Sequence, residues 1–125
     1  MDIESAPDVK KLARIIVRKL PFPYINFNRL VFMRSRNATS RARARIWSFP
    51  RIWQMALRLP PYYVIEVLAH HFDHLSDDDK ARVIIHELMH IPRNFSGALV
   101  PHKGIHKRID RRTVESLFRM YKESL

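Results

Sequence analysis

One stretch of the sequence reads Val83-Ile84-Ile85-His86-Glu87-Leu88-Met89-His90-Ile91-Pro92, and it predicts the helix around which the fold is built. Two histidines and a glutamate are set into this apolar run in the pattern H-E-x-x-H. A helix turns about 100° per residue, so His86 and His90 lie one turn apart on one face, and both imidazoles can reach one metal ion. Glu87 lies to the side of that face, where its carboxylate can take a proton from a metal-bound water rather than bind the ion. This division of roles is typical of zinc hydrolases.

The residues on either side of the stretch predict where this helix begins and ends. Ser76-Asp77-Asp78-Asp79 combines a capping serine with aspartates, which the positive end of a helix dipole stabilises, and Pro92 should end the helix. From Val83 onward, apolar residues cover nearly its whole circumference, so we expect its second half to be buried on several sides. Two histidines and a glutamate are costly in such a place unless they have partners, and a bound metal ion supplies one.

Length and composition narrow the class of protein. With 125 residues, of which 46% are hydrophobic, the chain fits one domain with a modest core. No segment approaches the roughly 20 apolar residues of a membrane-spanning helix, and the polar first residues do not form a signal peptide. We therefore expect a soluble, cytoplasmic protein without a membrane partner.

Two further features of the composition bear on its partners. The chain has no cysteine, which excludes disulfides, thiolate metal sites and cysteine nucleophiles, so any metal must be held by His, Asp or Glu. Its formal net charge of +11 favours an anionic partner such as nucleic acid. Solubility or heat resistance would explain the same charge without any such partner.

The first half of the chain predicts a helix followed by two strands. Ser5 as a cap and Pro7 in the first turn begin a helix that Pro21 ends. Alternating residues then predict strands at 24–36 and 41–47, which we expect to pair as a hairpin. The arginines that this hairpin would gather near one end are Arg34, Arg36, Arg41, Arg43 and Arg45.

The second half predicts more helix than strand. A short helix is expected after Ser48-Phe49-Pro50, and the aromatic and β-branched run at 62–68 predicts a third strand with a helical turn after it. Apolar residues at helical spacing from Ile105 to Tyr121 predict an amphipathic C-terminal helix. The expected fold is α+β, with a small, mainly antiparallel sheet, an N-terminal helix, the motif helix beneath the sheet and a closing C-terminal helix.

A catalytic zinc ion takes three protein ligands, so a third must join His86 and His90. The metzincin pattern H-E-x-x-H-x-x-G-x-x-H is excluded because Arg93 and Ser96 stand at its later Gly and His positions. We favour His102, since the loop at 93–104 in which it lies holds both glycines of the chain with their backbone freedom, and such a loop can fold back over the helix end. The alternatives that stay open are His106, Asp110 and Glu115.

With Zn²⁺ as the cofactor, Glu87 would serve as the general base for a water that attacks a peptide carbonyl. No partner for the oxyanion can be singled out among Tyr62, Tyr63, Tyr121 and Arg93. Because extended peptides bind along sheet edges, we expect one of the strands to border the cleft. His70 and His74 have the spacing of a second ligand pair, but we expect them to be surface residues.

Two interpretations compete with the peptidase hypothesis. In a chain with seven histidines, the H-E-x-x-H pattern can arise by chance. Alternatively, the histidines hold a structural zinc ion in a non-catalytic or regulatory domain that binds nucleic acid. The position of the motif on a capped and otherwise apolar helix favours a metal site, because that is the context in which the mechanism works.

The motif His86-Glu87-Leu88-Met89-His90-Ile91-Pro92, with Phe95-Ser96-Gly97 and Pro101-His102 after it, resembles small zinc metallopeptidases predicted in archaeal and phage genomes. The resemblance extends upstream through Ala44-Arg45-Ile46-Trp47, Tyr63-Val64-Ile65-Glu66 and Phe72-Asp73-His74-Leu75-Ser76, and so covers most of the chain. More distantly, the chain is similar to SprT-type proteases, which act on DNA-associated proteins.

This resemblance implies a minimal zincin fold with residues 1–125 as a single metallopeptidase domain. It also implies His86, His90 and His102 as zinc ligands, Glu87 as the catalytic base and a protein or peptide as the substrate. Which peptide is cleaved does not follow from it.

Overall fold

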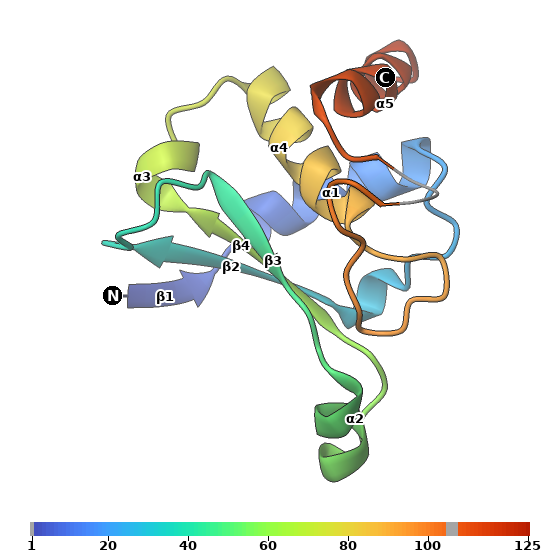
Figure 1. Ribbon diagram of the computed structural model, residues 1–125. Helices are drawn as coiled ribbons and strands as arrows, with labels where there is room; N and C mark the ends of the chain where they lie inside the picture. The colour runs from blue at the N-terminus through green and yellow to red at the C-terminus, as the bar shows by residue number, and fades with distance from the viewer. Residues whose placement is uncertain (1, 105–107) are drawn as a thin grey trace.

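The computed structural model describes residues 2–104 and 108–125, which form a four-stranded sheet packed against helices (Figure 1). The elements in chain order are β1 (Asp2–Ser5), α1 (Pro7–Lys19), the 3-10 turn η1 (Phe27–Arg29), β2 (Leu30–Arg36), β3 (Ala44–Trp47), α2 (Arg51–Leu57), β4 (Tyr63–Leu68), α3 (Ala69–Phe72), α4 (Asp77–Met89) and α5 (Arg111–Glu123). The strand order is β1-β2-β4-β3. The outer pairs are antiparallel and the β2–β4 pair is parallel, so the predicted α+β fold with a mainly antiparallel sheet is confirmed.

The predicted hairpin between the second and third strands is wrong, because β4 lies between them. Residue Ile65 of β4 pairs with Phe32 of β2 on one side and with Ile46 of β3 on the other. Tyr63, Ile65 and Val67 of β4 are fully buried, whereas the Arg-containing β3 is only partly buried. The most apolar strand therefore takes a central position, where it is paired along both edges, and β3 becomes an edge strand.

This strand order also disperses the arginines that a hairpin would have gathered. Arg34 is buried and donates hydrogen bonds to Asp8 and Asp73, and Arg36 pairs with Glu4. Arg45 forms a bidentate pair with the buried Glu66 at 2.8 and 3.2 Å. Three of the five arginines are therefore paired with acidic side chains. The basic face predicted at this end of the sheet is therefore mostly an ion-pair network within the protein.

Several element boundaries differ from those expected from the sequence. Ser5 does not cap α1, since it ends β1 opposite Met33, and Ala6 caps α1 without a side-chain hydrogen bond. The strand expected from residue 24 begins at Leu30, because the Asn26 side chain accepts a hydrogen bond from the Asn28 N–H and caps η1. The C-terminal helix begins only at Arg111, and Ile105 lies outside the described residues.

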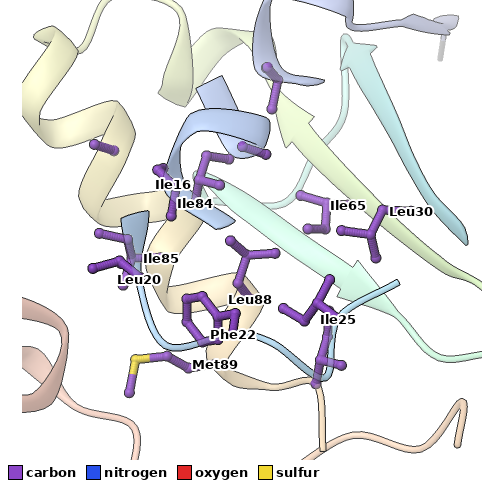
Figure 2. Packing of buried hydrophobic residues seen from close by; sticks show 14 of the residues in the cluster. Ile16, Leu20, Phe22, Ile25, Leu30, Ile65, Ile84, Ile85, Leu88 and Met89 are labelled. Atoms are coloured by element: carbon purple, nitrogen blue, oxygen red, sulfur yellow. The ribbon is translucent and has the colours of Figure 1, made fainter. Parts of the chain in front are cut away.

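The core forms where α1 and α4 meet the sheet. Figure 2 shows Ile16 of α1, Ile84 and Leu88 of α4, and Ile65 of β4 within this cluster. On its outer side α4 contacts α5, whose Val114, Phe118 and Tyr121 are buried. The motif helix therefore lies under the sheet and is closed off by the C-terminal helix, as predicted. None of the described helices has the length and apolar character needed to cross a membrane.

The motif helix α4 begins where the sequence predicts. The Ser76 hydroxyl accepts a hydrogen bond from the Asp79 N–H at 3.1 Å, and α4 starts at Asp77. The helix ends at Met89, with His90 as its C-cap in the right-handed helical region, so the two motif histidines still lie about one turn apart on one face.

Helix α2 differs from the other helices in projecting away from the sheet (Figure 1). Its apolar side chains are largely in solvent: Ile52 is 74% exposed and Met55 is 67% exposed. Only its base is anchored, where the Gln54 side-chain amide donates to the carbonyls of Phe49 and Ser96. Gly97 packs against this base with φ +93°, and a Cβ atom there would collide with the Phe49 carbonyl.

Candidate metal centre

Three histidines converge at the C-terminal end of α4. His86 belongs to its last turns, His90 is its C-cap, and His102 comes from the loop that follows. One ring nitrogen from each lies within 4.8 Å of the others, and this is the one group of three or more potential metal ligands found among the described residues. The Nε2 atoms of His86 and His102 are 3.2 Å apart.

These distances fit a metal ion bound by three imidazoles. Two nitrogens bonded to zinc at about 2.0–2.1 Å with tetrahedral geometry lie roughly 3.3–3.4 Å apart. The observed separation between His86 and His102 is close to that value. Imidazole nitrogens without thiolates or carboxylates are a donor set suited to zinc and to several other transition metals. The chain's own residues therefore make a site of suitable size and chemistry for a transition-metal ion.

The loop that carries His102 is fixed to the end of α4 by hydrogen bonds. The Val100 N–H donates to the His90 carbonyl at 2.7 Å, and the His90 Nδ1–H donates back to the Val100 carbonyl at 2.6 Å. The second bond orients the ring and places its lone pair on Nε2, the arrangement usual for metal-binding histidines. On the far side, the His102 carbonyl accepts a hydrogen bond from the Ile109 N–H at 2.9 Å.

The buried hydroxyl of Tyr63 fixes an earlier part of the same loop. It accepts a hydrogen bond from the Gly97 N–H and donates one to the Ala98 carbonyl, both at 2.8 Å. Tyr63 therefore holds the loop and is not placed to stabilise an oxyanion. Tyr121, another candidate for that role, is buried on α5 and packs against Phe118.

Burial shifts the pKa values of the two neighbouring motif residues in opposite directions. Burial, together with the nearby His90 and His102 imidazoles, lowers the pKa of His86 to about 4, so this ring is neutral at pH 7, as a metal ligand must be. Burial raises the pKa of Glu87 to about 8, because the residue is only 7% exposed and its carboxyl has no ion pair within the described chain. Glu87 is therefore a buried group whose proton can move near neutral pH.

The other candidates for the third ligand do not join the two motif histidines in this arrangement. The Glu115 carboxylate accepts hydrogen bonds from Arg82 at 2.9 and 3.3 Å, and Asp110 caps α5 by accepting one from the Thr113 N–H. His106 lies outside the described residues. The structure brings His102 to the centre, and its role as a ligand stays a prediction. His70 and His74 are exposed and form no such group within the described chain.

A cavity of about 410 Å³ opens beside His86 and Glu87. Arg43 and Ala44, at the start of the edge strand β3, form one wall, so a sheet edge borders this cavity; that a strand borders the substrate cleft stays a prediction. Arg111 and Val114 of α5 form another. The sequence did not single out these α5 residues, because they reach the site only through the packing of α5 on α4.

One comparison with known proteins gives a match. A protein-family model described as "Putative phage metallopeptidase" matches residues 1–122. No match was found among curated proteins or solved structures.

Proposed function

Since the chain belongs to the family described as putative phage metallopeptidases, we propose that it is a zinc-dependent peptidase in which Glu87 is the general base. One observation carries the proposal: three imidazoles, two from the end of α4 and one from the loop after it, have ring nitrogens within 4.8 Å of one another, and the buried Glu87 lies between the two motif histidines in sequence. Family membership supports the reaction class, while the all-histidine donor set supports zinc as the metal.

The metal-binding role falls to His86, His90 and His102. When bound, zinc polarises the substrate carbonyl and makes a water molecule more acidic. The protein contributes by holding the ligands in place, since the hydrogen bond from His90 to Val100 fixes one ring and the ordered loop presents another. Burial keeps His86 neutral and available as a ligand.

Glu87 accepts a proton in the first step of the reaction and donates it in the second. As the oxygen of water forms its bond to the peptide carbonyl carbon, the Glu87 carboxylate takes one proton from it. As the carbon–nitrogen bond breaks, the Glu87 carboxyl delivers this proton to the leaving amine. The carboxyl lies in the wall of the cavity that also exposes His86, which suits both transfers.

The decisive experiment is Glu87→Gln with metal content and peptide hydrolysis measured on the same sample. We expect one bound zinc ion and a rate about 10²- to 10⁴-fold lower, the usual contribution of a general base. Glu123→Gln, on the exposed end of α5, is the matched control and should cleave like the wild type. A Glu87→Gln variant that cleaves as fast as this control would end the proposal.

The identity of the metal is tested separately. Removing the metal with a chelator should abolish hydrolysis, and adding back one equivalent of zinc should restore it. Restoration by another divalent ion but not by zinc would contradict the zinc assignment while leaving Glu87 in its role.

Nucleic acid is the proposed second partner, favoured by the net charge of +11. The rival function is that of a non-catalytic or regulatory domain that binds nucleic acid and holds a structural zinc ion. In that case no peptidase activity would be found, and Glu87→Gln would leave nucleic-acid binding intact. If phosphate contacts carry the binding, affinity for duplex DNA should fall steeply with salt. An affinity that does not change with salt would exclude this partner.

A further inference from the structure

The arginines around the cavity beside Glu87 are not all paired with acidic side chains within residues 2–104 and 108–125. Its floor is formed by α4, and its two walls by the start of β3 and by α5. Three arginines line it, Arg43, Arg82 and Arg111, together with the acidic residues Asp79 and Glu115 and the proposed general base Glu87. One of the three arginines is ion-paired within the protein, and within the described residues the other two are not.

Arg82 is the engaged arginine. It donates to Glu115 at 2.9 Å and to Asp79 at 2.9 Å, and its guanidinium carbon lies 4.0 Å from the centre of the Phe118 ring. The three charged groups therefore satisfy one another. A lysine or arginine of a substrate would have to displace Arg82 from these carboxylates before it could bind them.

Arg43 and Arg111 are the two that are not engaged. Both are exposed, and neither forms an ion pair within residues 2–104 and 108–125. Their backbones are nevertheless fixed: the Arg43 carbonyl accepts a hydrogen bond from the Leu68 N–H at 3.0 Å, and Arg111 is the first residue of α5, directly after the N-cap Asp110. Two arginines on fixed backbone positions thus border a cavity that is also lined by the apolar side chains of Val83 and Val114.

Building on the proposed peptidase function, we propose that this cavity is the substrate subsite next to the scissile bond and that it binds an acidic side chain. Arg43 and Arg111 bind the carboxylate of a substrate glutamate or aspartate, while Val83 and Val114 contact its methylene groups. Guanidinium is the cation best suited to this task, because its planar fork can donate two hydrogen bonds to one carboxylate. The location of the cavity directly beside Glu87 places this side chain next to the bond that is cleaved.

The test compares peptides that differ only at the residues flanking the scissile bond, with Glu, Gln or Lys at each position. For one of the two positions we expect kcat/KM to be about tenfold higher for Glu than for Gln, a reasonable sum for two partly exposed charge-assisted contacts. Lys should be the poorest of the three. Equal rates for the three peptides, or a preference for Lys, would overturn the inference.

The chain offers a matched control for each arginine. Arg43→Gln and Arg111→Gln should each lower the Glu-to-Gln ratio about threefold, and the double variant should abolish it. Arg41→Gln and Arg112→Gln remove the same charge from close neighbours that do not line the cavity, so the ratio should not change. If the controls reduce the ratio as much as the cavity variants do, general surface charge explains the preference and the subsite is refuted.

A binding measurement separates this inference from the proposed function. Fluorescence anisotropy with the Glu87→Gln protein should show tighter binding of the Glu peptide than of the Gln peptide, with the difference lost in Arg43→Gln/Arg111→Gln. If wild-type protein cleaves no peptide, the proposed function fails whatever this measurement shows. If it cleaves peptides but the anisotropy shows no preference for Glu, the subsite alone fails.

Discussion

The burial of Glu87 has a consequence for stability that can be measured on the metal-free protein. In the folded state burial raises the pKa of this carboxyl from 4.5 to about 8, and in the unfolded chain water restores the ordinary value. Between these two values the folded protein holds a proton that the unfolded chain has lost. The folded state is therefore favoured at low pH, and this advantage is lost as the pH rises toward 8.

The size of the effect follows from the shift. Each pKa unit corresponds to about 1.4 kcal/mol, so the full shift amounts to roughly 5 kcal/mol between the two ends of the window. His86 acts in the opposite sense, because its lowered pKa of about 4 makes its contribution to stability fall as the pH drops below 6.5. Between pH 6.5 and about 8 the Glu87 effect should therefore outweigh that of His86 and reach about 2 kcal/mol.

The assay is urea unfolding of the wild type and of Glu87→Gln across this pH range, with a chelator present throughout. We expect the variant to gain about 2 kcal/mol in free energy of unfolding relative to the wild type from pH 6.5 to about 8, because glutamine has no proton to lose. Glu123→Gln, whose carboxylate is exposed in both states, should show a difference that does not vary with pH. A similarly flat difference for Glu87→Gln would refute the reasoning, since it would mean that water reaches this carboxyl in the folded protein.

Three further predictions concern the elements that build the site. Gly97→Ala should destabilise the protein by about 2–4 kcal/mol in urea unfolding, because its positive φ disfavours a side chain and the new Cβ would meet the Phe49 carbonyl; a cost below 1 kcal/mol would contradict the packing. Ser76→Ala should cost about 1 kcal/mol by removing the N-cap of α4, and no measurable cost would show that the cap is not formed in solution. His102→Ala should weaken zinc binding by more than the roughly 10- to 100-fold typical of outer-shell changes, measured by competition with a chromogenic chelator. The exposed His74→Ala should leave zinc affinity unchanged, and equal losses in the two variants would remove His102 from the site.

Features encoded by neighbouring residues could be predicted from the sequence. The four-residue spacing of His86 and His90 fixes their common helix face, and Ser76 marks the start of α4. The Asp110-x-x-Thr113 pattern was equally local, and it explains why the Asp110 carboxylate is engaged in capping α5. Read as a cap at the outset, it would have argued against Asp110 as a third ligand.

Features that depend on distant contacts could not be predicted in this way. The insertion of β4 between β2 and β3 is decided by which strand gains most from burial on both edges, and local alternation does not reveal this. Glu115 could not be excluded as a ligand, since its partner Arg82 lies on another helix. The same holds for Arg111, which borders the cavity only because α5 packs on α4.

The projecting helix α2 bears on how substitutions should be tolerated during evolution. In the core, replacing a buried isoleucine by a smaller residue costs several kcal/mol, whereas Ile52 and Met55 have most of their surface in water and little packing to lose. Selection for folding alone would let these positions drift toward polar residues, which would also make the protein less prone to aggregate. Fold stability therefore does not account for the apolar character of α2, and a variant with serine at both positions should fold as stably as the wild type.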